Sequence, residues 1–170
     1  MDEFIDIVDE EDRVLYQVSK VEAHEKGLLH RTVISELINS RGEWISVKQA
    51  SDRQDPGQYV SPMGGHVVAG ETEEEALKRE ILEELGISEF DYKLVGKGIF
   101  RRYVRNRDEN HYFILYEAYS DVEPTLNEES VDYKKFTQDD LSREMKRQPK
   151  QFGDAFHFVV KRFYPHFLDL

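Results

Sequence analysis

The chain has no cysteine among its 170 residues, so it cannot form disulfide bonds. It also has no run approaching the roughly 18 consecutive apolar residues from which a membrane span is recognised. Its first residues, MDEFIDIVDEEDR, are acidic and lack the basic and apolar segments of a secretion signal. These absences argue against export and against a membrane span, and we expect a soluble, cytoplasmic protein.

Positive charge is also scarce, because 23 lysine and arginine residues face 35 aspartate and glutamate residues, for a formal net charge of -12. Such a charge repels nucleic acid phosphates at long range and argues against binding to a nucleic acid duplex. An acidic protein can still bind a small phosphorylated ligand through cations, so metal ions are expected partners. The length suits a single domain, and no internal repeat, linker or low-complexity tract divides residues 1–170.

Strand-like and helix-like patterns alternate along the chain, which predicts an α/β fold with a mixed sheet. Near the amino terminus, FIDIVD and RVLYQVS flank a polar turn and predict a hairpin. A short helix is expected at 21–26, and a final helix at 152–168 is expected to be appended to the domain. Further strands are expected at 30–39, 44–51, 58–67, 91–104 and 111–120, with RNRDEN connecting the last two.

A glutamate-rich helix is expected between Thr72 and Gly86. Thr72 and Glu75 have the spacing of a capping box, and Gly86 is a natural C-terminal stop. One side of the helix is apolar, and the opposite face carries the carboxylates of Glu80, Glu83 and Glu84. Like charges at these spacings destabilise an isolated helix by roughly a few tenths of a kcal/mol per pair. A hard cation such as Mg2+ would reverse that effect, whereas a solvated charged face is the simpler alternative.

The spacing of residues before and within this helix indicates a particular family more specifically than the charge of the helix does. Gly65 is followed after five residues by Glu71, and after seven more by REILEELGI, from Arg79 to Ile87. This spacing resembles the Nudix box at every fixed position. The resemblance implies a Nudix fold, which is an α/β/α sandwich with a mixed central sheet. It also implies metal-dependent hydrolysis of a small-molecule substrate in which a diphosphate is linked to another moiety.

The Nudix resemblance further implies roles for individual residues. The implied ligands of the metal, Mg2+ or Mn2+, are Glu80, Glu83, Glu84 and the backbone carbonyl of Gly65. Arg79 matches the arginine that orients the catalytic helix, and Glu71 is expected to brace the loop. The general base stays open, because members of the family place it either on the box helix, here at Glu80, or on a later loop. Glu128 and Glu129 are the later-loop candidates, and the number of metal ions is also open.

A second resemblance covers the opening FIDIVDEEDRVLYQVSKVEAHEKGLLHRTV, which is similar to the Nudix branch that includes type 1 isopentenyl-diphosphate isomerase. In that isomerase, a cysteine just before the Gly-His of the box loop is essential, and here Gly64 takes its place. Glu109 aligns with one isomerase glutamate, and His111 falls where the second would be. Moving a proton on an alkene needs such an acid/base pair. We therefore expect hydrolysis, with isomerase-like activity or ligand binding without turnover as the alternatives.

The isomerase branch also binds a divalent metal through histidines, which suggests a second metal site. His24, His30 and His66 fall near the matching positions, with Glu109 and His111 expected close by. Imidazole suits zinc, manganese or iron better than magnesium. The spacing from His24 to His30 is one residue short of the isomerase pattern, and scattered histidines usually have structural roles, so the site is left open.

Basic residues are concentrated in RRYVRNR, which either binds the substrate phosphates or is a solubilising edge strand and loop. Guanidinium groups form bidentate contacts with phosphate oxygens. Alternation along a strand places Arg101 and Arg105 on one side, as candidate phosphate ligands, and Arg102 on the other. The identity of the diphosphate substrate and the formation of a homodimer are not determined by the sequence.

Overall fold

A computed structural model of the chain describes residues 2–169. The strands are β1 (Phe4–Val8), β2 (Val14–Ser19), β3 (His30–Ile38), β4 (Trp44–Gln49), β5 (Tyr59–Val60), β6 (Met63–His66), β7 (Asp91–Val104), β8 (Arg107–Tyr119) and β9 (Ser130–Phe136). The helices are α1 (Lys20–Lys26), α2 (Glu73–Leu85), α3 (Gln138–Arg147) and α4 (Asp154–Phe163), with short 3-10 turns at Pro149–Gln151 and Pro165–Leu168.

The described strands form one mixed sheet. Its main path runs β2-β1-β3-β4-β5; β6 and β8 also pair with β3, β7 pairs with β8, and β9 pairs with β4. The β3–β8 pair is parallel and continues from His30 opposite His111 to Ile38 opposite Tyr119. The neighbouring pairs β1–β3, β3–β6 and β7–β8 are antiparallel, which confirms the mixed sheet.

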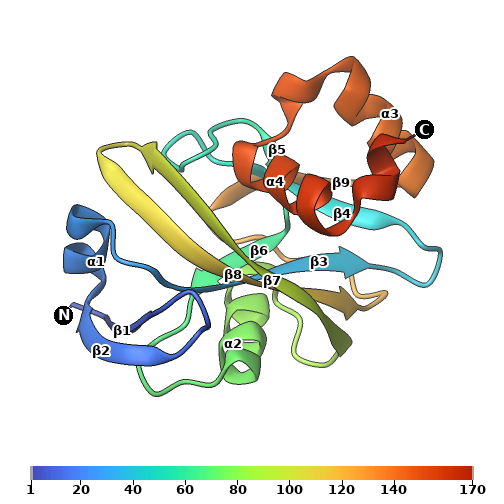
Figure 1. Cartoon of the computed structure of the whole chain (residues 1–170). Coiled ribbons are helices and arrows are strands. Elements are labelled where there is room, and N and C mark those ends of the chain that lie inside the picture. Colours follow the sequence, from blue (N-terminus) through green and yellow to red (C-terminus); the bar gives the residue numbers. More distant parts are fainter. Residues whose placement is uncertain (1, 170) are drawn as a thin grey trace.

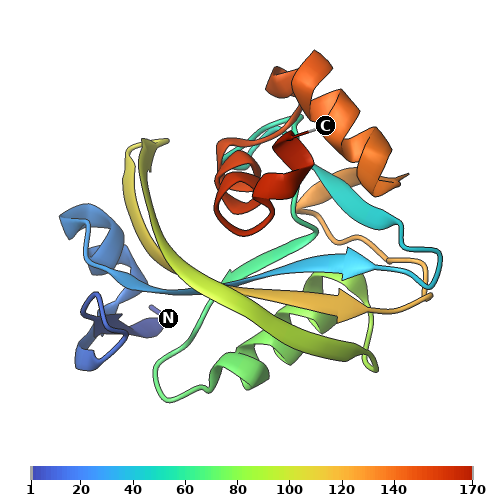
Figure 2. The same cartoon turned by 45° about the vertical axis from the view of Figure 1, so that its right-hand side comes forward.

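Helices cover both faces of this sheet, as the views from two sides show (Figures 1 and 2). Successive residues of a strand point to opposite faces. Val33 on β3 therefore packs in the apolar cluster that includes α2, whereas Ile34 packs with α3, α4 and the carboxyl-terminal turn. The expected α/β/α sandwich is confirmed, and its two cores lie on opposite sides of the same central strands.

The glutamate-rich helix α2 has the ends that its sequence predicts. The Thr72 hydroxyl accepts a hydrogen bond from the Glu75 amide at 3.1 Å, and the Glu75 carboxylate accepts one from the Thr72 amide at 2.8 Å. Gly86 ends the helix with φ of 68°, a left-handed conformation that glycine adopts at low cost. The helix therefore begins and ends at the boundaries predicted from Thr72 and Gly86.

The connection between β7 and β8 is shorter than predicted. Instead of the six residues RNRDEN, it is only Arg105 and Asn106, with φ of 49° and 59°, and the next four residues continue β8. Two consecutive residues with positive φ match the twist of a tight hairpin. The charges that suggested a loop are paired across the strands, because Arg101 binds Asp108 and Arg102 binds Glu109.

Two other boundaries also differ from the prediction. The single strand expected at 58–67 is two short strands, because β5 pairs with β4 whereas β6 pairs with β3, with Pro62 between them. The helix expected at 152–168 ends at Phe163, since Pro165 has no amide hydrogen to continue it, and a 3-10 turn follows. The expected amino-terminal hairpin is formed by β1 and β2.

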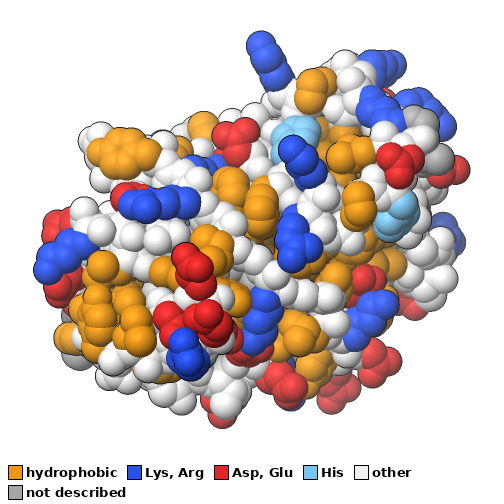
Figure 3. Space-filling view, viewed as in Figure 1, with side chains coloured by type: hydrophobic (Ala, Val, Ile, Leu, Met, Phe, Trp, Pro, Cys, Tyr) orange, Lys and Arg blue, Asp and Glu red, His pale blue; other side chains and the backbone are white. Residues whose placement is uncertain are grey.

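Exposed apolar side chains are concentrated at one end of the sheet, around the edge strand β2 (Figure 3, lower left). The large hydrophobic residues exposed there are Phe4, Val14, Leu15, Tyr16 and Val21. No helix within residues 2–169 is long and apolar enough to cross a membrane.

Candidate active site and metal centre

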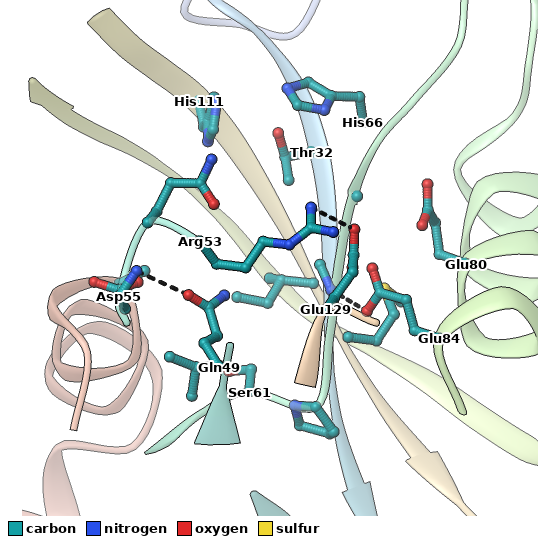
Figure 4. Close-up of a pocket in the computed structure, with 18 of the residues that line it drawn as sticks. Thr32, Gln49, Arg53, Asp55, Ser61, His66, Glu80, Glu84, His111 and Glu129 are labelled. Carbon is teal, nitrogen blue, oxygen red and sulfur yellow. Dashed lines mark hydrogen bonds and ion pairs between the residues drawn. The ribbon is translucent and has the colours of Figure 1, made fainter. Parts of the chain in front are cut away.

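A single cavity of about 560 Å³ brings the predicted site residues together. Its walls come from α2, β6, the loop between β4 and β5, and the β7–β8 hairpin (Figure 4). Glu80, Glu83 and Glu84 line one side, and His66 and His111 line another. The box carboxylates and the histidines thus face the same space.

The close approach of α2 to β6 depends on Gly65. A Cβ atom on this residue would lie 2.1 Å from the carboxyl carbon of Glu80, so a larger residue would push the helix or the carboxylate away. The Glu80 side chain is only 12% exposed, whereas that of Glu83 is 57% exposed. Glu84 accepts a hydrogen bond from the Gly64 amide at 3.4 Å. The three predicted metal ligands therefore range from a buried carboxylate to an open one.

Arg79 joins the box helix to the loop that precedes it. Its guanidinium donates to Glu71 at 2.7 and 2.9 Å, to Glu80 at 2.6 Å and to the carbonyl of His66 at 3.1 Å. Glu71 also accepts a hydrogen bond from the amide of Val68 at 3.0 Å. The expected bracing by Glu71 is thus seen in these contacts, and Arg79 also lies 3.6 Å from the carboxylate of Glu83.

Carboxylates are crowded around Glu84, because Glu80 and Glu129 lie close to it, paired with Arg79 and Arg53 respectively. Burial, together with the nearby charge of Glu129, raises the pKa of Glu84 to about 10. Burial also raises the pKa of Glu80. Glu129 lines the cavity, whereas its neighbour Glu128 is exposed and lies outside it. Oxygen ligands crowded in this way fit a hard divalent cation, which would stabilise their ionised forms.

Four imidazoles converge beside the carboxylates. His24, His30, His66 and His111 each offer a ring nitrogen within 4.8 Å of the others. The Nε2 atom of His24 lies 3.3 Å from that of His66 and 3.5 Å from that of His111. The structure therefore gathers the three histidines proposed for a second metal and adds His111.

The histidine cluster fits a transition metal on two further observations. Burial lowers the pKa of His24 to about 3 and of His30 to about 4, and it lowers the pKa values of His66 and His111 as well, so all four rings are neutral. His30 contacts the carbonyl of Leu28 through Nδ1 at 2.8 Å, while its buried Nε2 has no hydrogen-bond partner. Neutral imidazoles with a fixed second nitrogen are the usual nitrogen ligands of metals.

Within RRYVRNR, the arginines that line the cavity are Arg102 and Arg107, and not Arg101 or Arg105. Arg101 pairs with Asp108 on the outside of the hairpin, and Arg105 occupies the turn. Arg102 in turn is held by Asp55 at 2.8 and 3.1 Å and by Glu109 at 3.0 Å. The candidate phosphate ligands predicted from the sequence therefore lie outside the cavity.

Arg53 and Arg107 are the cavity arginines that the sequence reasoning missed. Arg107 begins β8 instead of lying in a loop, and it contacts the ring of His24 at 3.0 Å. Arg53 belongs to the polar loop SDRQDPGQ, which has no periodic pattern to indicate where a side chain points. The alternation of side chains along a strand did place Arg102 on the opposite face from Arg101. That alternation was the one feature of the sequence that could have indicated which of these two arginines lines the cavity.

The family of the chain follows from comparison with known proteins. The NUDIX domain pattern matches residues 28–156. An uncharacterized Nudix hydrolase of Nostoc sp. is 37% identical over 129 residues, covering 74% of this chain and 75% of that protein. An isopentenyl-diphosphate Delta-isomerase of Photorhabdus laumondii is 30% identical over 137 residues, covering 79% and 77%.

A solved structure of a Deinococcus radiodurans protein has the same fold, with a TM-score of 0.75 at 24% identity, covering 95% of this chain and 99% of that one. Together with the intact box and its geometry, these matches show that the chain belongs to the Nudix hydrolase family.

Proposed function

We propose that this protein hydrolyses a diphosphate linked to another moiety in a small molecule, by metal-dependent attack of water on phosphorus. The observation that carries the proposal is the group of carboxylates from Glu80, Glu83, Glu84 and Glu129 around one side of the cavity. Such a group is unfavourable unless cations bind to it. Hydrolysis of a diphosphate also requires cations, because the anionic oxygens around phosphorus hinder attack by water unless their charge is neutralised.

Different residues of the cavity would bind the metal, position the helix and accept a proton. Glu80, Glu83, Glu84 and the carbonyl of Gly65 would hold Mg2+ or Mn2+, which would neutralise negative charge and make a water molecule more acidic. Arg79 fixes the position of α2 through Glu71 and the His66 carbonyl. Glu80 and Glu129 are the two candidates for accepting the proton of the attacking water, because both are carboxylates inside the cavity.

The substrate is expected to be a small anionic molecule. Its phosphates would meet Arg53, Arg107 and Lys20, which line the cavity. The floor of the cavity includes Phe113 and Phe156, which offer an apolar surface to the group attached to the diphosphate. Nucleotides and prenyl diphosphates both have this combination of a charged end and a less polar one.

Isomerisation is the second candidate, favoured by the identity to the Photorhabdus isomerase and by the histidine cluster. Against it, Gly64 stands on β6 where the isomerase resemblance requires cysteine, and the chain has no other thiol. Glu109, the remaining acid of that comparison, is tied to Arg102 at 3.0 Å. Hydrolysis needs neither group, so we favour it over isomerisation and over ligand binding without turnover.

Release of phosphate, pyrophosphate or phosphate monoesters from a panel of diphosphates, followed by phosphorus NMR, tests the hydrolase proposal. The panel includes nucleoside diphosphates and triphosphates, nucleotide sugars and isopentenyl diphosphate, each assayed with Mg2+, Mn2+ or EDTA. We expect release from at least one substrate with metal and none with EDTA. Conversion of isopentenyl diphosphate to its isomer without release of phosphate would contradict the proposal, and so would stabilisation by a ligand that is never cleaved.

We also propose that the four histidines bind one transition metal, such as zinc, manganese or iron. At a free metal concentration about 100 times the dissociation constant, binding would stabilise the fold by about 2.7 kcal/mol. We therefore expect Zn2+ to raise the melting temperature of the wild type and of His166→Ala, an exposed histidine outside the cluster, but not of His111→Ala. Metal analysis after purification without chelators would count the ions, and equal responses of all three proteins would contradict the site.

A further inference from the structure

Arg53 crosses the cavity and joins two loops that are distant in the sequence (Figure 4). It comes from the connection between β4 and β5, and its Nη1 atom lies 3.0 Å from the carboxylate of Glu129, just before β9. A backbone hydrogen bond from Ala50 to the carbonyl of Glu129, 2.9 Å long, ties the same two loops together. The ion pair is therefore held by a fixed backbone on both sides.

The guanidinium of Arg53 is only partly satisfied by these contacts. Its Nε atom is buried and has no hydrogen-bond partner, and the carboxylate of Asp52 lies 3.7 Å from it, beyond hydrogen-bond distance. Arg102 differs, because Asp55 and Glu109 occupy its guanidinium from both sides. An arginine has five N–H donors, and a buried donor without a partner costs free energy. Arg53 is thus a cavity arginine with donor capacity left for an anionic ligand.

Glu129 occupies the opposite end of this contact. Its side chain lies between Arg53 and Glu84, and its charge is the second cause, after burial, of the raised pKa of Glu84 (Figure 4). A phosphate entering the cavity would therefore compete with Glu129 for the same cation. Guanidinium groups bind phosphate oxygens in a bidentate manner, which makes phosphate a strong competitor for a single 3.0 Å contact.

We infer that Arg53 exchanges partners when a diphosphate binds: it leaves Glu129 for the phosphate and thereby releases Glu129 toward Glu84. This inference rests on the proposed function, because the release of Glu129 matters for the reaction only if Glu129 is a candidate base. Arg53 is then a positioning residue for Glu129 as well as a ligand of the substrate. Binding of the diphosphate and release of the Glu129 carboxylate are therefore coupled through the side chain of Arg53.

A double-mutant cycle in ligand binding tests the exchange without any turnover. The probe is imidodiphosphate, a diphosphate analogue with a bridging nitrogen, titrated calorimetrically in saturating Mg2+. The proteins are the wild type, Arg53→Gln, Glu129→Gln and the double variant. Glu128→Gln is the matched control, because this neighbouring glutamate is exposed and does not line the cavity.

We expect Glu129→Gln to tighten binding roughly 5- to 10-fold, since Arg53 no longer has to be released, and Arg53→Gln to weaken it roughly 10-fold or more. In the Arg53→Gln background, the gain from Glu129→Gln should disappear. Glu128→Gln should leave the affinity unchanged. An equal gain in both backgrounds, no gain at all, or an effect of Glu128→Gln as large as that of Glu129→Gln would overturn the exchange.

The cycle also separates this inference from the hydrolase proposal. If the diphosphate panel shows no cleavage but the cycle is non-additive, the exchange stands and the hydrolase proposal falls. If cleavage occurs and the cycle is additive, the hydrolase proposal stands and Arg53 is a phosphate ligand without influence on Glu129.

Discussion

Glu84→Gln is expected to lower the rate of diphosphate hydrolysis by roughly three orders of magnitude, equivalent to about 4 kcal/mol of transition-state stabilisation. The substitution keeps the shape of the side chain and its contact with the Gly64 amide, but it removes the charge that holds the metal. Because burial and Glu129 disfavour the ionised form of Glu84, its charge is also expensive in the absence of a cation. The variant should therefore be at least as stable as the wild type while losing activity.

The measurement is a comparison of kcat/KM with a melting curve for each protein. Glu128→Gln changes a glutamate on the same loop as Glu129, outside the cavity, and should behave as the wild type. A Glu84→Gln variant that retains more than about a tenth of the wild-type kcat/KM would remove this residue from the metal site, because a tenfold loss corresponds to only about 1.4 kcal/mol.

Glu36→Gln is expected to stabilise the protein progressively as the pH rises from 5 to 8. Glu36 is 1% exposed, and it lies on the face of β3 that packs toward the carboxyl-terminal helices. The hydroxyl of Ser61 donates to its carboxylate at 2.5 Å, and Glu117 is its neighbour on β8. Burial, together with the charge of Glu117, raises the pKa of Glu36 to about 8.

The sign of the pH effect follows from the protons bound in each state. Between pH 4.5 and 8 the folded protein keeps the proton on Glu36, whereas the unfolded chain releases it. The wild type therefore loses stability as the pH rises through this window, by at most about 1.4 kcal/mol per pH unit from this group. Glutamine stays neutral and retains an oxygen to accept the Ser61 hydrogen bond, so the variant escapes this loss.

Urea unfolding of both proteins at pH 5 and pH 8 measures the difference directly. The free energy of unfolding of Glu36→Gln minus that of the wild type should be several kcal/mol larger at the higher pH. Glu89→Gln, at an exposed position, is the control for the loss of one negative charge. A difference that is the same at both pH values would show that Glu36 is not held in its neutral form.

The sequence predicted the parts of this molecule that depend on local patterns. The capping box at Thr72 and Glu75, the stop at Gly86 and the apolar side of α2 are encoded within fifteen or so consecutive residues, and the spacing rules for helices describe them. The glutamates of the box were located for the same reason. The family follows from those residues, while the metal-binding roles and the single-domain organisation stay predictions.

Contacts between distant loops were not predictable in this way. The pairs Arg53–Glu129 and Arg102–Asp55 join segments that are far apart in the chain, and neither partner has a periodic neighbour that fixes its direction. The β7–β8 connection was predicted too long because charged residues usually indicate a loop, whereas here they pair across two strands. Glu36 carried a signal that was overlooked, since a charged residue within the apolar run VISELI must be buried or turned outward.

The most direct test of the central claim is hydrolysis in water enriched in oxygen-18. The best substrate from the panel is incubated with the protein and Mg2+, and the products are analysed by phosphorus NMR and mass spectrometry. Attack of water on phosphorus predicts one labelled oxygen in a phosphate product and none in the organic moiety. Label on a carbon-bound hydroxyl of the organic moiety, or an isomerised substrate without cleavage, would contradict the assignment of diphosphate hydrolysis at phosphorus to this site.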